Sequence, residues 1–377
     1  MEVIYLFIPS SHRRDTLFYV EKIGKEEILE EENKTALAGW MNGQRPTPET
    51  REPITSGTRS NIVDIVKGIA IALVVYGHTA QGMFHRGWWA GRGAVFSDVF
   101  IYSFHMPAFF FVAGLFVMSS LAKRGSQHFA TDKLKTIVYP YLLFAIITVS
   151  IEPLIGRFKS GTRPFHWNTF LMSVADGDAG WFLFVLFLCL MLALMTARLP
   201  AWLRCLAAVI AGLLPPFGPP FLGQVLHEFC FLAAGTWVGT RIFRLEQMRV
   251  TTAALGFVLL AVFQTAMIYV YGPPALWRWI YIVLGLTGTA GLFMLAKLLD
   301  KHRIGDGIAW VGRGSLAVFL LSAFAQGATR EVLLRVFHTR EFWLQLLLPT
   351  LFATIMPAIV WHQQDRWRIG WLFRWPF

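Results

Sequence analysis

The chain alternates long apolar segments with short polar ones. A membrane-spanning helix needs about 20 mostly apolar residues, whereas a membrane β-strand alternates apolar and polar positions over about ten residues. The long runs fit the first pattern and exclude the second. We therefore predict an all-α polytopic membrane bundle of about ten transmembrane helices, at residues 62–82, 96–120, 135–155, 180–198, 201–217, 222–243, 251–271, 279–298, 308–328 and 343–361.

The two ends of the chain differ from the part between them. Residues 1–60 are polar and mixed in charge, so we predict a flexible cytoplasmic tail there, followed by a transmembrane domain over 61–361 and a cytoplasmic C-terminal tail over 362–377. Lys and Arg are more numerous in the segments that lie inside when the N-terminus is inside, which is the bias of cytoplasmic loops. An even number of spans then places both termini in the cytoplasm.

Composition supports the membrane assignment and narrows the chemistry. The chain is 55% hydrophobic and 15% charged, with a mean hydropathy of +0.51. Its net charge of +11 does not indicate nucleic-acid binding, because membrane proteins concentrate basic residues in cytoplasmic loops. The three cysteines lie in apolar stretches without a Cys-x-x-Cys pair, and no metal-ligand spacing such as His-Glu-x-x-His occurs. We expect no metal and no nucleic-acid partner.

Ionisable side chains inside the first two apolar segments are the main functional candidates, because a charge within a membrane is costly. Lys67 and His78 are eleven residues apart, which places them within about 20° of each other on one helix face and about 16 Å apart along it. His105 lies in the next segment. Alternatively, Lys67 reaches the membrane interface with its long side chain and His78 caps its helix, while His105 is a hydrogen-bonded core histidine beside Pro107.

Two motifs carry a resemblance to a known family. The first motif is a basic residue followed, after ten further residues, by a histidine, and it runs from Asp64-x-x-Lys67-Gly68 to Tyr76-Gly77-His78. The second motif begins with Phe104-His105-Met106-Pro107 and continues into the apolar run that ends with Phe111-Val112-Ala113-Gly114. Over about residues 59 to 360 the chain resembles the integral-membrane acyltransferase-3 family, and within it the fucose 4-O-acetylase-like and exopolysaccharide O-acetyltransferase branch.

This resemblance implies roles for the candidates. The histidine that matches His78 is the essential one in the family, and imidazole suits a general base because it titrates near neutral pH. His105 would be its catalytic partner. Lys67, Lys133 and Lys135 would bind the anionic nucleotide of an acetyl-CoA donor at the cytoplasmic side. For the last two, ordinary positive charge at the cytoplasmic face is the alternative.

Two further residues are candidates for contacting the acceptor. Glu228 is an acid within an apolar span, which is rarely without a function. Trp181 opens the span after the polar loop and resembles a family feature, although tryptophan is also common at membrane interfaces.

The resemblance implies a membrane O-acetyltransferase of the bacterial inner membrane, which moves acetyl from acetyl-CoA to a hydroxyl of a surface or exported saccharide or a lipid-linked glycan. A transporter that exports a glycan or small acid is the alternative, since buried histidines and carboxylates also serve proton relays. A third possibility is a scaffold that has lost activity, against which the intact Lys67–His78 pair speaks.

Overall fold

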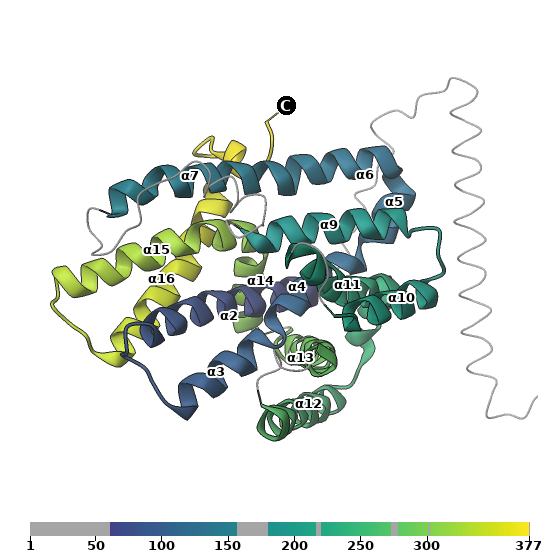
Figure 1. The fold of residues 1–377 in the computed structure, drawn as a ribbon, viewed down its shortest axis with the longest axis horizontal. Coiled ribbons are helices and arrows are strands. Elements are labelled where there is room, and N and C mark those ends of the chain that lie inside the picture. Colours follow the sequence, from purple (N-terminus) through teal and green to yellow (C-terminus); the bar gives the residue numbers. More distant parts are fainter. Residues whose placement is uncertain (1–60, 157–179, 216–219, 273–277, 301, 377) are drawn as a thin grey trace, which may run out of the picture. The chain divides into compact units, whose positions relative to one another are not determined.

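The computed structural model describes residues 61–156, 180–215, 220–272, 278–300 and 302–376, and every regular element in these residues is helical. Figure 1 shows the helices in their order along the chain. Their bounds are α2 (Ile62–Phe84), α3 (Arg92–Tyr102), α4 (His105–Leu115), α5 (Val117–Arg124), α6 (Ser126–Lys133), η2 (Leu134–Val138), α7 (Tyr139–Gly156), α9 (Trp181–Met195), α10 (Ala201–Leu213), α11 (Pro220–Val238), η3 (Gly239–Gln247), α12 (Val250–Tyr271), α13 (Arg278–Leu299), α14 (Arg303–Arg313), α15 (Ser315–Arg335), α16 (Phe342–Gln363) and η5 (Gly370–Leu372).

The prediction of a polytopic helical membrane bundle is confirmed. Seven helical stretches in the described residues are long and apolar enough to cross a membrane, and α9 and α10 are shorter apolar helices. The long stretches are Ile62–Phe84, Arg92–Arg124, Phe221–Gln247, Val250–Tyr271, Arg278–Leu299, Ser315–Arg335 and Phe342–Gln363. The total of ten spans stays a prediction. The expected tail over 1–60 and the polar loop over 157–179 lie outside the described residues.

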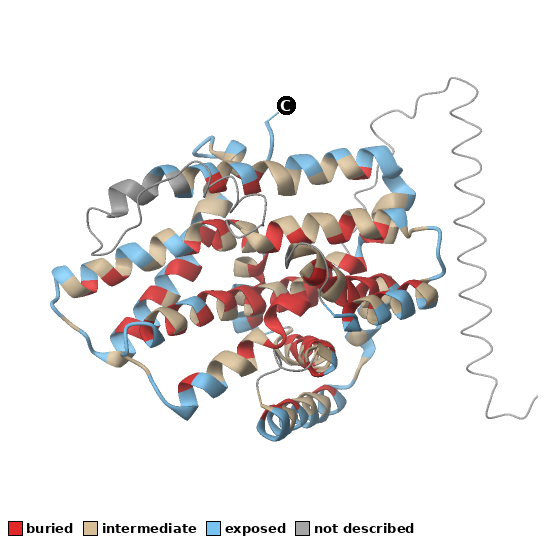
Figure 2. Ribbon diagram, in the orientation of Figure 1, coloured by how far each residue is buried: buried red, intermediate tan, exposed pale blue. Residues whose placement is uncertain are grey.

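Helix α2 is the central element of the bundle. It packs against α4, α13, α14, α15 and α16, and residues from all sides of it are buried. Figure 2 shows this burial along α2, α4 and α11, in contrast to α12, which exposes much of its surface. A helix that is surrounded in this way can carry polar side chains without exposing them to lipid.

Glycines allow two pairs of helices, α2 with α14 and α4 with α11, to pack closely in the core. A side chain on Gly68 of α2 would collide with the carbonyl oxygen of Ile308 in α14. In the same way, Gly114 of α4 faces the backbone of α11 at Leu232, and Gly235 of α11 faces the carbonyl oxygen of Phe111. Small residues at such positions let membrane helices approach until their backbones touch, which is a main source of packing energy without a hydrophobic effect.

Two predicted spans are interrupted. The segment predicted as one helix over 96–120 has a break at Ser103 and Phe104, between α3 and α4. The cause is Pro107, which has no N–H for a hydrogen bond to the carbonyl of Ser103 and whose ring clashes with that carbonyl in a continuous helix. The helix restarts at His105, so that the proline falls in the first turn of α4, where it is tolerated.

The predicted span over 308–328 is not a single helix. α14 ends at Arg313 and α15 begins at Ser315, with Gly314 between them. α14 has charged residues on one face and presses Gly312 against the backbone of α2 at Asp64. The membrane-length helix therefore begins only after Gly314 and extends to Arg335.

Replacing Gly235 with valine should strongly destabilise the bundle, because the new side chain would force α11 away from α4. We expect a loss of about 3 kcal/mol in unfolding free energy, the upper part of the range for overpacked cores. The unfolding temperature in detergent, followed by size-exclusion chromatography after heating, measures it. Gly327→Ala in α15 is the matched control, because nothing lies within 4 Å of its Cβ position; equal unfolding temperatures for the two variants would contradict the close-packing argument.

Candidate functional site

The structure brings the two predicted catalytic histidines to one place. Tyr102, the last residue of α3, lies between them: its ring centroid is 6.4 Å from that of His78 and 4.8 Å from that of His105, edge-on in both cases. His78 is exposed, whereas only 1% of His105 is accessible. The three rings form a continuous polar-aromatic cluster on α2, α3 and α4.

The helix break before Pro107 fixes the tautomer of His105. Nδ1 of His105 lies 2.6 Å from the carbonyl oxygen of Ile101, four residues earlier. In an unbroken helix that carbonyl would accept from the backbone N–H of His105. A carbonyl can only accept, so Nδ1 carries the proton and donates it, and Nε2 keeps a lone pair. His105 is thereby poised to accept a proton or a hydroxyl hydrogen bond through Nε2.

Tyr102 was not singled out from the sequence. Its ring packs directly on the backbone of α2, because a Cβ on Gly77 would lie 2.9 Å from its Cε2 atom. Its hydroxyl group is buried and has no hydrogen-bond partner among the described residues. The glycine directly before His78 was the available signal, but a glycine does not reveal which side chain fills the space beside it.

Polar contacts hold the half of α2 around His78 in place. Toward α3, Gln81 donates to Asp98 at 2.9 Å, and the hydroxyls of Tyr76 and Ser97 are 3.0 Å apart. From α15, Gln326 donates to the carbonyl of Val75 at 2.6 Å and to the hydroxyl of Thr79 at 2.9 Å. His78 therefore lies on a helical segment that hydrogen bonds join to α3 on one side and to α15 on the other.

Lys67 lies at the other end of the same face of α2. Its ammonium group is 2.6 Å from Asp64, and a quarter of the side chain is accessible. Between Lys67 and His78 the face carries Ile71 and Val74, which are 1% and 3% exposed. The middle of this face is thus packed against protein, while His78 at its far end is exposed. Neither side chain lines an open, water-filled passage in this structure.

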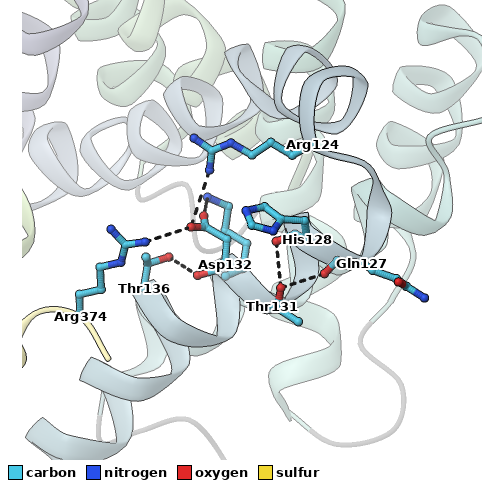
Figure 3. A network of polar contacts seen from close by, with 8 residues as sticks. Arg124, Gln127, His128, Thr131, Asp132, Thr136 and Arg374 are labelled. Atoms are coloured by element: carbon cyan, nitrogen blue, oxygen red, sulfur yellow. Dashed lines mark hydrogen bonds and ion pairs between the residues drawn. The ribbon is translucent and has the colours of Figure 1, made fainter. Parts of the chain in front are cut away.

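Lys133 pairs with Asp132, whereas Lys67 pairs with Asp64. Figure 3 shows Asp132 between Arg124 and Arg374. Asp132 lies 3.2 Å from Lys133, 3.7 Å from Arg124 and 3.9 Å from Arg374. α6, which carries this group, packs mainly on η2, α5 and α9. Exposed Lys135 is next to it in η2, and its carbonyl accepts from the backbone N–H of Trp375. The sequence did not identify Asp132 as the shared anion.

Glu228 lies in a second buried polar cluster, on α11 and α13. One of its oxygens accepts from the hydroxyl of Tyr281 at 3.3 Å, and the ring of His227 is 4.8 Å from that of Tyr281. The other carboxyl oxygen of Glu228 and Nε2 of His227 have no partner in the described part of the chain. A buried polar atom without a hydrogen-bond partner lowers the stability of the fold. The two unpaired atoms of this cluster are therefore available to bind a polar group.

Trp181, the first residue of α9, is half buried and edge-on to Phe182. Phe182 in turn contacts Phe110 of α4 and Phe319 of α15. Trp181 therefore belongs to the aromatic packing around α4.

Comparison with known proteins gives one positive finding. The acyltransferase-3 family model, described as an acyltransferase domain, matches residues 60–369. No curated protein matches significantly, and no solved structure does.

The difference in burial between the two histidines can be measured. Diethyl pyrocarbonate should modify exposed His78 well before buried His105, because an imidazole must be accessible to react. Mass spectrometry of digested protein after timed treatment gives the two rates, with exposed His128 as the reference for an unprotected site. Equal rates for His78 and His105 in the folded protein would show that the site is arranged differently.

Proposed function

This chain belongs to the acyltransferase-3 family, and from that premise we propose that it moves an acetyl group from acetyl-CoA to a hydroxyl group of a saccharide. The family establishes a membrane acyltransferase. The acetyl donor, the saccharide acceptor and the catalytic histidine are our proposal. The observation that carries it is the His78–Tyr102–His105 cluster, in which a histidine with a fixed tautomer, an accessible histidine and an unpartnered hydroxyl meet.

Each of the three groups has a role in acyl transfer. His78 removes the proton from the acceptor hydroxyl as its oxygen attacks the thioester carbonyl. The hydroxyl of Tyr102, which has no partner in the described residues, donates to the oxygen that becomes negative in the tetrahedral intermediate. Nε2 of His105 accepts from a second hydroxyl of the saccharide and orients it. The intermediate then collapses, the C–S bond breaks, and the thiolate of coenzyme A leaves with the proton held by His78.

Lys67 is our candidate for the donor's anionic end. Asp64 keeps it in place at 2.6 Å, and Lys133 and Lys135 add positive charge on η2 and the end of α6. A donor entering from the cytoplasmic side would place its phosphates at Lys67 and its acetyl group near His78, a rise of about 16 Å along α2. Because Ile71 and Val74 are packed, such entry requires a neighbouring helix to move away from this face.

The same proposal assigns the acceptor side. We place the protein in a bacterial inner membrane with both termini in the cytoplasm, so that His78 and His105 face the outer half of the bilayer. Glu228 and Trp181 would contact the saccharide, Glu228 through its unpaired oxygen. The acceptor is then a surface or exported saccharide or a lipid-linked glycan.

His78→Ala should reduce transfer by roughly 10²–10⁴-fold, the usual contribution of a general base. Membranes incubated with radiolabelled acetyl-CoA, followed by counting of the saccharide fraction, measure it. His128→Ala on α6 is the control and should leave labelling unchanged. The proposal fails if His78→Ala labels as well as the wild type. If even the wild type adds no label and deletion traps glycan inside the cell, a glycan exporter is the correct reading.

Lys67→Met should weaken donor binding. Loss of a hydrogen bond to a charged group costs about 1.5–3 kcal/mol, so we expect the KM for acetyl-CoA to rise roughly tenfold or more with a smaller change in kcat. Steady-state kinetics at varied acetyl-CoA concentration test this. Lys123→Met is the control, because it removes the same charge from an exposed lysine on α5. An unchanged KM in Lys67→Met would place the donor elsewhere.

A further inference from the structure

Arg330 of α15 is a buried cation inside a membrane-length helix. It is 8% exposed, and its Nη2 atom donates to the carbonyl oxygen of Thr79 at 3.1 Å. Its Nε atom has no hydrogen-bond partner, and no carboxylate forms an ion pair with it in the described part of the chain. An isolated charge in such a place is strongly unfavourable unless an anion joins it.

The guanidinium group of Arg330 lies over the face of α2 that carries His78. Its Nη1 atom is 2.5 Å from the position that a Cβ on Gly82 would take. Gly82 is four residues after His78, so its side-chain position lies on the same face, about 6 Å from the Cβ of His78. The absence of a side chain at Gly82 is what leaves room for Arg330.

A second guanidinium approaches the same glycine. Nη1 of Arg86 donates to the carbonyl oxygen of Gly82 at 3.0 Å, so both guanidinium groups reach the same residue of α2. The carboxylates nearby are already engaged, since Glu331 pairs with Arg335 at 2.8 Å and Asp98 accepts from Gln81. Two cations thus converge near His78, and neither forms an ion pair with a carboxylate among the described residues.

The need to hold α15 against α2 does not explain why a charged residue stands at Arg330. Gln326, one turn earlier in α15, already bonds to Val75 and Thr79 of α2 through a neutral amide. A second neutral side chain would serve equally well and would avoid the cost of burying a charge. The charge of Arg330 therefore points to a ligand.

We propose that Arg330, assisted by Arg86, binds a carboxylate or phosphate group on the acyl acceptor and holds the acceptor beside His78. Guanidinium groups bind such oxyanions through paired hydrogen bonds, and Nε of Arg330 has no competing bond in the described residues. This inference rests on the proposed function, because it assigns the chemical class of that acceptor. The anionic group belongs either to the sugar, as a carboxylate, or to a lipid carrier, as a diphosphate.

Ligand binding to the purified full-length protein in lipid nanodiscs, without acetyl-CoA, tests the proposal. The probes are two matched pairs: octyl glucuronide against octyl glucoside, and farnesyl diphosphate against farnesol. We expect at least one anionic probe to raise the unfolding temperature and change tryptophan fluorescence, and its neutral partner not to do so. A response to the glucuronide alone assigns the site to a sugar carboxylate, and a response to the diphosphate alone assigns it to the lipid carrier.

Arg330→Gln should weaken binding of the responding anionic probe by roughly tenfold or more. Arg330→Lys, which keeps the charge but loses the paired geometry, should weaken it less, and Gly82→Ala should weaken it by displacing the guanidinium. Gln326→Ala is the matched control: it loosens the α15–α2 contact but keeps the charge, and should bind like the wild type.

The proposal is wrong if neither anionic probe binds the wild type, or if the Arg330 variants that fold bind as well as the wild type does. Because acetyl-CoA is absent, neither result depends on transfer activity. Failure of the transfer reaction itself appears separately, in the labelling experiment with His78→Ala.

Discussion

Inside a bilayer every backbone carbonyl needs a partner from the protein, because no water is available to replace one. Pro107 removes the helical hydrogen bond to the carbonyl of Ser103 and ends α3, and the last turn of α3 closes with the backbone N–H of Phe104 donating to the carbonyl of Ile101 at 3.3 Å. The imidazole of His105 donates to this carbonyl at 2.6 Å and is thereby held in one tautomer and one orientation. The carbonyl at the end of α3 thus accepts two hydrogen bonds, one from the backbone and one from the imidazole that it orients.

The position of α2 depends on close packing at glycines as much as on apolar side chains. Gly68 and Gly312 bring α14 against the start of α2, while Gly77 admits the ring of Tyr102 and Gly82 admits Arg330 near its end. One helix thus combines two uses of small residues: backbone contact near Lys67 and space for polar side chains around His78. Neighbouring helices cover much of this polar half, which lowers the cost of placing its polar groups in a membrane.

The sequence predicted those features that are local along the chain. The length and apolar character of the segments predicted the helical membrane class, and helix periodicity placed Lys67 and His78 on one face. The structure buries the middle of that face at Ile71 and Val74 and leaves His78 exposed. Tyr102, Asp132 and Arg330 were missed because their importance comes from contacts between distant segments. Arg330, for example, meets Thr79 across 251 positions of sequence. The break at Gly314 was also missed, because apolar composition alone does not register where a helix is interrupted.

The packed pair Ile71 and Val74 has a consequence for the energetics of the cell. An open, water-filled channel from Lys67 to His78 would give protons a path of about 16 Å, roughly half of the hydrocarbon thickness, and would weaken the membrane as a barrier to ions. Ile71 and Val74 instead have almost no accessible surface, so water does not reach these two positions. Their burial thus keeps the middle of this face dry.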